Sequence, residues 1–442
     1  MSNHLQVGID FALKQAVFYL ASPDGHPVAT HKSYANSAVG YAQVKDLLTT
    51  TMQRRGFDGL DIAGEATSTY WMPYFLQLAS DADLTAAGLR LVLLNPRWVY
   101  WHKKSFGDEN KADPSDAYYV TEYLRTHPAA AGWSPQLGTW PLRCYTRLRF
   151  RLAHQVAGQK CYYLTLLFLS NSAYSQRKPF SDLFGPTSQQ VLSHWPELDA
   201  LAEEDMVELL ETWSKHRLSD PLQTAQRLAE IRAESFVVPE PLQTAVQRCL
   251  DLTLQQIRVG EEQIATVEGW IAQEAAQHPD VAHLATIPGI GPVCSSGIVA
   301  ELGDVERFVN GERWDAHRQQ MVPRNLRNAE DAVAKIAGLW WPRRESADFA
   351  AEDRRMAKTG NRYLRYYLIE AADRMRLSLP DYRLYYEAKY REATKHHYKR
   401  ALVLTARKAV GLIVGLLHRH EPYRSREERQ AAQTPPASAN NP

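Results

Sequence analysis

The sequence predicts an α/β domain with a mixed sheet, followed by an all-α region. Two observations lead to this prediction. Short apolar runs typical of strands alternate with helix-like patterns over the first third of the chain. A long helical pattern with few breakers then extends from residue 241 to about residue 277, and further helical patterns flank the turns that follow it. Alternating strands and helices are typical of a sheet covered by helices.

The elements of the first third can be placed in order. Strands are expected around residues 7–10, 16–20, 31–35, 60–64 and 89–94, and helices at 39–54, 70–79 and 113–125. The first two strands are close enough in the chain to form a β-hairpin, whereas the later strands alternate with helices. The expected sheet therefore contains both antiparallel and parallel pairs.

The remainder of the chain is expected to be helical. An aromatic-rich helix should run from residue 143 to about 169, and prolines separate short helices over 180–240. Apolar residues over 241–277 recur at spacings of three, four and seven, which fits an amphipathic helix or a coiled coil, and its acidic outer face favours a dimerisation or spacer role. The predicted domains are 1–170, a metal-binding sheet domain; 171–240, a helical insertion; 241–280, a coiled-coil helix; 281–424, a helical domain; and 425–442, a disordered polar tail.

Composition narrows the classes of protein. Hydrophobic residues make up 45% of the chain and aromatic residues 10%, as in a globular protein with a sizeable core. The longest apolar stretches, such as residues 409–417, are too short to span a bilayer, and no signal-peptide pattern opens the chain. The 4 cysteines show neither a disulfide framework nor paired metal-binding spacing. We therefore expect no membrane partner and a reducing, cytoplasmic setting.

The net charge of +1 conceals a strong segregation of charge along the chain. Residues 197–306 carry 6 Lys and Arg against 20 Asp and Glu, whereas residues 307–442 carry 27 against 16. A basic C-terminal third favours a nucleic acid partner, because Lys and Arg replace the counterions condensed on phosphates. The acidic middle segment disfavours contact with phosphate.

Four acidic residues are placed as in a metal-dependent nuclease core. Asp10 follows the first apolar run, Glu65 ends a later strand, and Asp113 and Asp116 are three apart on one face of a helix. Carboxylates placed in this way could converge on Mg²⁺ (or Mn²⁺), which takes oxygen ligands and bridges to substrate phosphate. Two such ions can clamp the attacking and leaving oxygens of a phosphoryl transfer. Four unrelated surface acids would give the same pattern.

A glycine-containing turn, Ile287-Pro288-Gly289-Ile290-Gly291, lies between two helical patterns. Glycines let backbone N–H groups approach an anion closely, as in the helix-hairpin-helix motif that holds a DNA phosphate. An ordinary turn in a helical protein would also fit this pentapeptide.

Ser346 is a candidate nucleophile because it follows two arginines, Arg343 and Arg344, and precedes a basic segment. A serine needs activation by a base, a metal or a cationic pocket, and arginines can stabilise charge that develops on a phosphate. A structural serine is the alternative. The candidate nucleic-acid-binding residues are Arg147, Arg149, Arg151, Gly289, Gly291, Arg343, Arg344, Lys358, Arg362 and Arg365.

Taken in order, these motifs resemble the IS110-family transposases, which are bacterial insertion-sequence recombinases. The matching segments are Val7–Asp10, Gly64–Trp71, Asn95–Pro96, Lys111–Ala117, Ile287–Gly291, Glu301–Phe308, Ala337–Leu339, Ser346, Thr359–Arg365 and His397–Leu402. They lie within residues 5–170 and 240–420 and occur in the order of the family.

The resemblance implies an RNase H-type, RuvC-like fold with a four-acid (DEDD) metal site, then a coiled coil, then a transposase domain with a serine nucleophile. Asp10, Glu65, Asp113 and Asp116 take the acidic positions, and Ser346 takes the serine position. It also implies donor and target DNA, a structured noncoding guide RNA from the element itself, a homo-dimer or tetramer, and a bacterial cytoplasmic, nucleoid-associated setting.

Three other functions remain open at this point. A RuvC-like endonuclease would use water as nucleophile and leave nicks without a covalent adduct, with Ser346 structural. An actin-like sugar kinase also has a first strand that runs into an Asp, but Phe11–Lys14 lacks the Gly/Thr phosphate loop. A non-catalytic nucleic acid binder would have no use for four acids.

Overall fold

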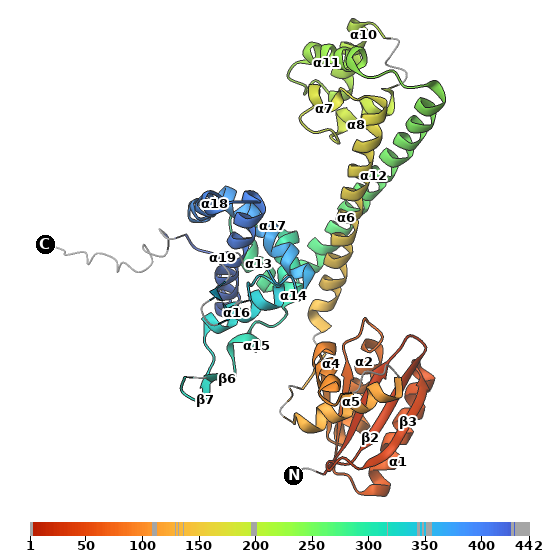
Figure 1. The fold of residues 1–442 in the computed structure, drawn as a ribbon, viewed down its shortest axis with the longest axis vertical. Helices are drawn as coiled ribbons and strands as arrows, with labels where there is room; N and C mark the ends of the chain where they lie inside the picture. The colour runs from red at the N-terminus through yellow and green to blue at the C-terminus, as the bar shows by residue number, and fades with distance from the viewer. Residues whose placement is uncertain are drawn as a thin grey trace, which may run out of the picture. The chain divides into compact units, whose positions relative to one another are not determined.

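The computed structural model of the chain forms two compact units, residues 1–137 (unit 1) and 138–442 (unit 2) (Figure 1). It describes residues 3–107, 113–128, 130, 132–135, 137–195, 201–315, 317–342, 345–346, 349–350, 356–425 and 428. For residues 113–115, 137, 345–346 and 349–350 it describes the backbone only. Each unit has hydrophobic cores of its own.

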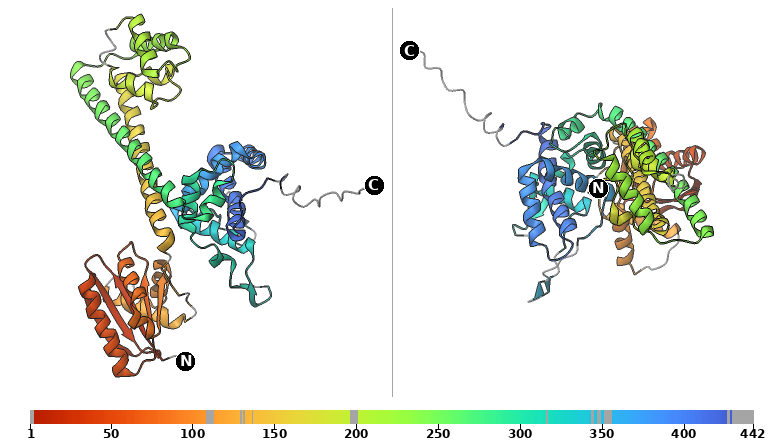
Figure 2. Two further views of the ribbon diagram at one scale, coloured as in Figure 1. Left: turned by 180° about the vertical axis from the view of Figure 1, so that it is seen from behind. Right: turned by 90° about the horizontal axis from the view of Figure 1, so that it is seen from above.

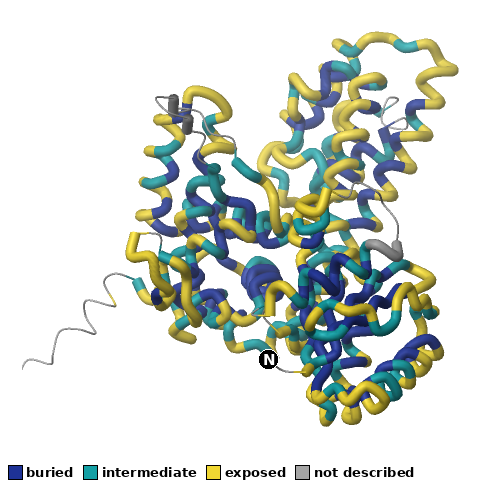
Figure 3. Tube along the Cα trace, turned by 60° about the horizontal axis from the view of Figure 1, so that its bottom comes forward, coloured by how far each residue is buried: buried dark blue, intermediate teal, exposed yellow. Residues whose placement is uncertain are grey.

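Unit 1 is built on a five-stranded mixed sheet. Its strands are β1 (His4–Phe11), β2 (Gln15–Ala21), β3 (Pro27–Ala35), β4 (Gly59–Glu65) and β5 (Leu89–Leu94). They lie in the order β3-β2-β1-β4-β5, with the β1–β2 and β2–β3 pairs antiparallel and the β1–β4 and β4–β5 pairs parallel. Strands β1 and β4 are buried along most of their length. Buried residues are drawn dark blue in Figure 3. The mixed sheet expected from the sequence is confirmed.

Helices cover both faces of this sheet. They are α1 (Ala38–Arg55), α2 (Met72–Ser80), α3 (Ala82–Ala86), α4 (Pro96–Ser105) and α5 (Asp113–Thr126). One core joins Ile9 of β1 to Leu48 of α1 and Phe75 of α2. A second core joins Ala63 of β4 to Val120 of α5. Alternate strand residues thus serve two cores, as the two-residue repeat of a strand requires.

Helix α4 was not expected from the sequence. Asn95 caps it by accepting a hydrogen bond from the Arg97 backbone N–H at 3.0 Å, and Pro96 occupies its first turn. Both residues are typical of a helix start. Val99 is the only residue of α4 that is buried. A ten-residue helix with one buried residue lacks the apolar periodicity by which helices are predicted.

Helix α5 packs against β1 at a residue without a side chain. A Cβ atom on Gly8 would lie 2.3 Å from Thr121 Oγ1 and 2.4 Å from the Ala117 carbonyl oxygen. The Thr121 hydroxyl is within hydrogen-bond distance of the carbonyl oxygens of Tyr19 on β2, at 3.1 Å, and Ala117, at 2.9 Å. Glycine at position 8 therefore sets how closely α5 approaches the centre of the sheet.

The Gly8→Ala substitution should destabilise the protein by about 1–3 kcal/mol, because the added methyl group forces α5 away from β1. Urea-induced unfolding of the full-length chain measures this loss. Gly158→Ala is the matched control: Gly158 lies in a helix, and its added Cβ would meet nothing within 4 Å. The control should be as stable as the wild type or slightly more stable. Equal stability of Gly8→Ala and wild type would contradict the packing described.

Unit 2 begins with a long helix pair. Helix α6 (Trp140–Ser170) lies beside α12 (Glu240–Ala275), and the two views in Figures 1 and 2 agree on this arrangement. Val156 and Tyr163 of α6 pack with Leu250 and Ile257 of α12 in one core. The same core contains residues of the lobe formed by α7 (Tyr174–Arg177), α8 (Pro186–Ser193), α10 (Glu203–Ser214) and α11 (Pro221–Glu234).

The C-terminal part of unit 2 is mainly helical. Its elements are α13 (Pro279–Ala285), α14 (Pro292–Leu302), α15 (Glu306–Val309), β6 (Glu312–Asp315), β7 (Gln320–Pro323), α16 (Leu326–Ala337), β8 (Glu345–Ser346), β9 (Phe349–Ala350), α17 (Arg362–Ser378), α18 (Pro380–Glu392) and α19 (His397–Arg419). The β6–β7 hairpin was not expected from the sequence; three of the four β7 residues and three of the four β6 residues are exposed.

Helix α19 is long and apolar enough to cross a bilayer by length and composition alone. In this fold it is a core helix, because 61% of its most apolar stretch is buried inside the protein. Ala406, Val410 and Ile413 pack in the same core as residues of α14 and α17.

Candidate active site

The sheet brings Asp10 and Glu65 to neighbouring strands. Strands β1 and β4 are parallel, and Ile9 is opposite Gly64 in their register. The residues that follow, Asp10 and Glu65, are therefore neighbours at the carboxyl ends of the two strands. Both side chains are half-buried. The placement predicted from the sequence for these two acids agrees with this geometry.

Helix α5 brings a third carboxylate, Asp116, into the electrostatic reach of Glu65. Asp116 directly precedes Ala117, the residue whose carbonyl oxygen lies against Gly8. Its Oδ1 accepts a hydrogen bond of 2.7 Å from Lys103 Nζ, which comes from helix α4. Two helices and two strands thus contribute to one site. The backbone of Asp113 begins α5, but its side chain lies outside the described residues.

The pKa of Glu65 is affected by its burial and by the two neighbouring acids. Burial, together with the negative charges of Asp10 and Asp116, raises the pKa of its carboxyl group to about 7. A hydrogen bond from the Thr67 hydroxyl at 3.4 Å and the positive charge of Lys103 act in the opposite direction. The three carboxylates therefore form a single electrostatic site in which negative charge is in excess.

The chemistry of this site fits a divalent cation. Carboxylate oxygens are the ligands that hard divalent cations prefer. The repulsion that raises the pKa of Glu65 is of the kind that a bound cation relieves. Among the side chains that the structure describes, no three of the metal-binding type stand close enough together to hold an ion as they are. Lys103 supplies the positive charge at Asp116 instead, so cation binding would involve movement of these side chains.

Ser346 lies in a small two-stranded sheet of unit 2. Strand β8 pairs antiparallel with β9, and Ser346 is opposite Phe349. The Ser346 side chain lies outside the described residues, as do Arg343 and Arg344. The structure therefore places the backbone of the candidate nucleophile but not its hydroxyl group.

The chain segments on either side of this small sheet are held together at its base. The Ala357 backbone N–H donates to the Trp340 carbonyl at 3.0 Å, and the Asn361 N–H donates to the Ile336 carbonyl at 2.7 Å. Gly360 has φ +111°, and a Cβ atom there would lie 2.2 Å from the Ile336 carbonyl oxygen. The contact between the end of α16 and the start of α17 thus fixes both ends of the segment that carries Ser346.

A buried ion pair ties three helices together beneath this base. The Arg147 guanidinium, from α6, donates to both carboxylate oxygens of Glu301 in α14, at 2.7 and 2.9 Å. The Glu301 side chain is 1% exposed. The side-chain amide of Asn361 donates to the same carboxylate at 2.6 Å, while its oxygen caps α17. The role of Glu301 is not evident from the sequence, because its partners Arg147 and Asn361 are 154 and 60 positions away in the chain.

The predicted nucleic-acid-binding residues that the structure describes fall into two groups; Arg343 and Arg344 lie outside the described residues. Some are engaged within the protein: Arg147 with Glu301, Arg149 with Glu268 and the Tyr366 hydroxyl, and Arg365 with the Ala337 and Lys358 carbonyls. Others are exposed: Arg151, Gly289, Gly291, Lys358 and Arg362. Gly289 and Gly291 belong to the turn between α13 and α14. The exposed group is the one whose side chains or backbone can reach a phosphate directly.

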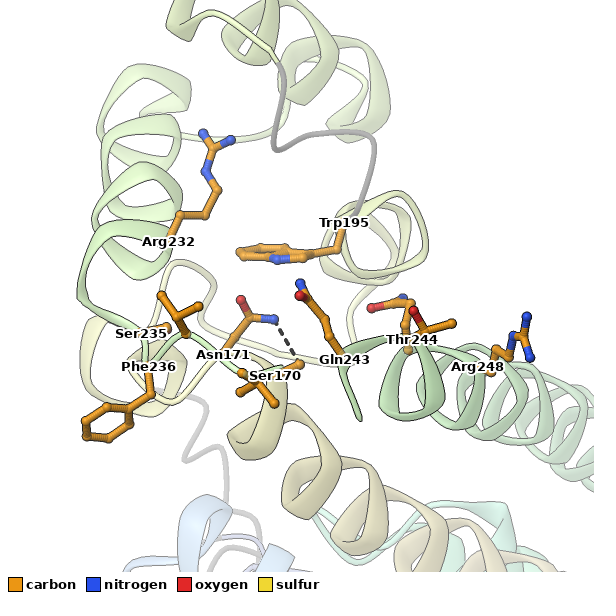
Figure 4. Close-up of a pocket in the computed structure, with 12 residues that line it drawn as sticks. Ser170, Asn171, Trp195, Arg232, Ser235, Phe236, Gln243, Thr244 and Arg248 are labelled. Carbon is orange, nitrogen blue, oxygen red and sulfur yellow. Dashed lines mark hydrogen bonds between the residues drawn. The ribbon is translucent and has the colours of Figure 1, made fainter. Parts of the chain in front are cut away.

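A cavity of about 680 Å³ lies in the helical lobe of unit 2 (Figure 4). Trp195, Phe236, Arg232 and Arg248 line it, and none of the described residues around it is acidic. All of its lining residues belong to unit 2.

Two family models match the chain. The DEDD transposase model of the IS110 type matches residues 7–169, which include all four acids. The model described as transposase IS116/IS110/IS902 family matches residues 281–317 and 321–387, which include Ser346. The chain belongs to the IS110 family of transposases. A comparison with curated proteins gives no match.

Membership in the family establishes the class of reaction. The protein is a DNA transposase, so its substrate is DNA. The DEDD domain indicates dependence on a divalent metal. Neither model covers residues 170–280, which contain the helical lobe and all of α12.

In metal-free buffer, the stability of the transposase should fall as the pH rises from about 4.5 to about 7. Glu65 stays protonated in the folded protein up to about pH 7, whereas in the unfolded chain it ionises near its ordinary pKa of 4.5. The folded state therefore binds more protons in this window, and the loss amounts to about 3 kcal/mol. Urea unfolding at a series of pH values, with EDTA present, measures this slope.

The Glu65→Gln variant should lose this part of the pH dependence, because the amide does not ionise. Glu208→Gln, at an exposed position of α10, should keep the wild-type slope. Identical slopes for Glu65→Gln and wild type would show that Glu65 does not titrate in this window.

The Arg147→Ala substitution should destabilise the transposase by about 3–5 kcal/mol, because it leaves the buried Glu301 carboxylate without its ion-pair partner. Arg151→Ala, one helical turn further along α6, should leave stability unchanged, since Arg151 is exposed. Thermal unfolding of both full-length variants tests this contrast. The structural account of Arg147 fails if the two variants are equally stable.

Proposed function

We propose that this transposase cuts and rejoins DNA through a phosphoserine intermediate on Ser346, supported by the carboxylates of Asp10, Glu65, Asp113 and Asp116. The observation that carries the proposal is the pairing of two matched regions in one chain. One holds a carboxylate site with excess negative charge, and the other holds Ser346 between two anchored segments. Hydrolysis by water would need only the carboxylate region, so the presence of the Ser346 region in the same chain favours a serine nucleophile.

The reaction proceeds in two transesterification steps. The Ser346 hydroxyl loses its proton and attacks the scissile phosphorus, forming a bond from Oγ to phosphorus. The bond to the 3′ oxygen breaks, and that oxygen leaves as a 3′-hydroxyl after taking up a proton. A 3′-hydroxyl from a partner strand then attacks the phosphoserine and regenerates the serine. Each step exchanges one phosphodiester for another, so ATP is not required.

Other residues of the chain bind the metal and the DNA phosphates. Asp10, Glu65 and Asp116 would hold the divalent cation that faces the scissile phosphate. Lys103 positions Asp116 through its 2.7 Å contact. A divalent cation (Mg²⁺ or Mn²⁺), when bound by these carboxylates, supplies charge neutralisation at the phosphate and lowers the pKa of the attacking hydroxyl. Lys358 and Arg362 are exposed near the base of the Ser346 segment and contact flanking phosphates.

The transposase acts together with an RNA, with DNA and with further copies of itself. A structured noncoding RNA guides the enzyme by pairing with donor and target DNA, while the protein reads backbone shape, as in other RNA-guided systems. The turn at Gly289 and Gly291 acts as a helix-hairpin-helix on a phosphate. The α6–α12 pair acts as the coiled coil of a homo-dimer or tetramer, because recombination cuts several strands together. The enzyme works at the nucleoid in the bacterial cytoplasm.

A metal-dependent endonuclease that uses water is the second candidate. Glu65 favours it, because a carboxyl group whose pKa is near 7 is suited to act as a general base on water. In that case Ser346 would be structural, and cleavage would leave nicks without a covalent link to the protein.

The Ser346→Ala variant should form no covalent protein–DNA adduct. A nicked suicide substrate carrying the element's end, run on a denaturing gel, shows the adduct as a protein band shifted by bound DNA. Ser378→Ala, at an exposed position of α17, should form the adduct as the wild type does. An adduct that persists in Ser346→Ala would overturn the serine assignment, and nicking without any adduct would support the endonuclease.

A further inference from the structure

Helix α4 exposes an unusual amount of aromatic surface. Trp98 is 56% exposed, Trp101 is 61% exposed, and Tyr100 lies between them in the helix with 53% of its surface exposed. Only Val99 anchors this helix in the core by burial. Contiguous exposed apolar surface of this kind marks an interaction site in a folded protein.

The surrounding charge is positive. The α4 sequence, Pro96–Ser105, contains Arg97, Lys103 and Lys104 and no acidic residue. Arg97 and Lys104 are exposed, and Lys104 Nζ lies 5.9 Å from the centre of the Tyr100 ring. Aromatic rings interleaved with cations match the two chemical groups of a nucleic acid strand, its bases and its phosphates.

The rings are held in place before any ligand binds. Trp98 stacks on Tyr123 of α5, with centroids 6.5 Å apart and planes inclined by 11°. Tyr123 in turn stacks on His127 at 4.1 Å and 5°. Trp101 meets the edge of Tyr100 at 5.3 Å. Ordering these side chains in advance lowers the entropy cost of binding.

The same helix reaches the carboxylate site. Lys103, two residues after Trp101, donates to Asp116 at 2.7 Å and lies 5.5 Å from the Tyr119 ring centre. Because residues two apart point to nearly opposite sides of a helix, the rings lie across α4 from Lys103, and a DNA strand with one phosphate at the carboxylates would reach them at neighbouring nucleotides. Duplex bases are already stacked on each other, so the rings can only take bases that are unpaired.

We propose that the exposed face of α4 is a stacking platform for unpaired DNA bases beside the carboxylate site, with Trp98 and Trp101 as its main contacts. The proposal rests on the proposed function, because it takes the carboxylates to be where the DNA strand is cut. It adds a binding surface for single-stranded DNA that cleavage chemistry alone does not require.

Fluorescence anisotropy compares the binding of full-length Trp98→Ala/Trp101→Ala and of the wild type. The ligands are a short fluorescein-labelled single-stranded DNA, its duplex and the RNA of the same sequence. Affinity of the double variant for single-stranded DNA should fall by about tenfold or more, since each stacked base contributes substantially to binding. Affinity for the duplex should be unchanged. Trp314→Ala is the matched control, because Trp314 is 60% exposed on β6 of unit 2; it should bind as the wild type does.

The Trp98→Phe/Trp101→Phe variant separates stacking from folding, because Phe keeps an aromatic ring at each position. It should retain most of the affinity for single-stranded DNA, and both double variants should keep the wild-type circular dichroism spectrum at the temperature of the binding assay. The platform is overturned if single-stranded DNA binding survives in the Ala variant, if only RNA binding is lost, or if the variant instead changes the oligomeric state in light scattering.

Failure of the platform and failure of the proposed chemistry give different results. Binding to single-stranded DNA needs no cleavage, so Ser346→Ala should bind it as the wild type does, whatever the nucleophile proves to be. A loss of binding in Ser346→Ala equal to that of the Trp98→Ala/Trp101→Ala variant would contradict a separate platform on α4.

Discussion

The close packing of helix α5 on strand β1 is the contact on which the carboxylate site depends. Because Gly8 has no side chain, the backbone of α5 lies directly against the strand that ends in Asp10. Asp116, on the first turns of that helix, is thereby close enough to Glu65 to raise its pKa. Gly8 thus lets the charge of Asp116 add to the effects of burial and Asp10 at the carboxyl ends of β1 and β4, and Lys103 offsets part of the excess negative charge.

The second unit uses a buried ion pair for a similar purpose. Glu301 binds Arg147 of α6 and Asn361 at the start of α17, so three helices meet at one carboxylate. The start of α17 in turn contacts the end of α16, and these two segments flank Ser346. Residues in the regions matched by the family models therefore have two roles, one structural and one in ligand binding. Some hold the frame of the site, and others, such as Lys358 and Arg362, are exposed to a ligand.

Sequence alone predicted the sheet well because buried strands need apolar residues at fixed spacing, as in β1 and β4. It did not predict α4, whose surface is aromatic and exposed, or the β6–β7 hairpin, which has almost no buried residues. The acids Asp10 and Glu65 could be placed because they end strands. The internal role of Arg147 could not, because its partner Glu301 is 154 positions away in the chain and only the tertiary fold brings them together.

If Ser346 is the nucleophile, DNA becomes covalently linked to it, and this link can be mapped to a single residue. Wild-type transposase would be incubated with a suicide substrate and a divalent metal, digested with a protease and a nuclease, and analysed by mass spectrometry. We expect a nucleotide attached to the peptide that contains Ser346 and to no other peptide. A nucleotide on a different residue, or complete cleavage of DNA with no modified peptide, would contradict it.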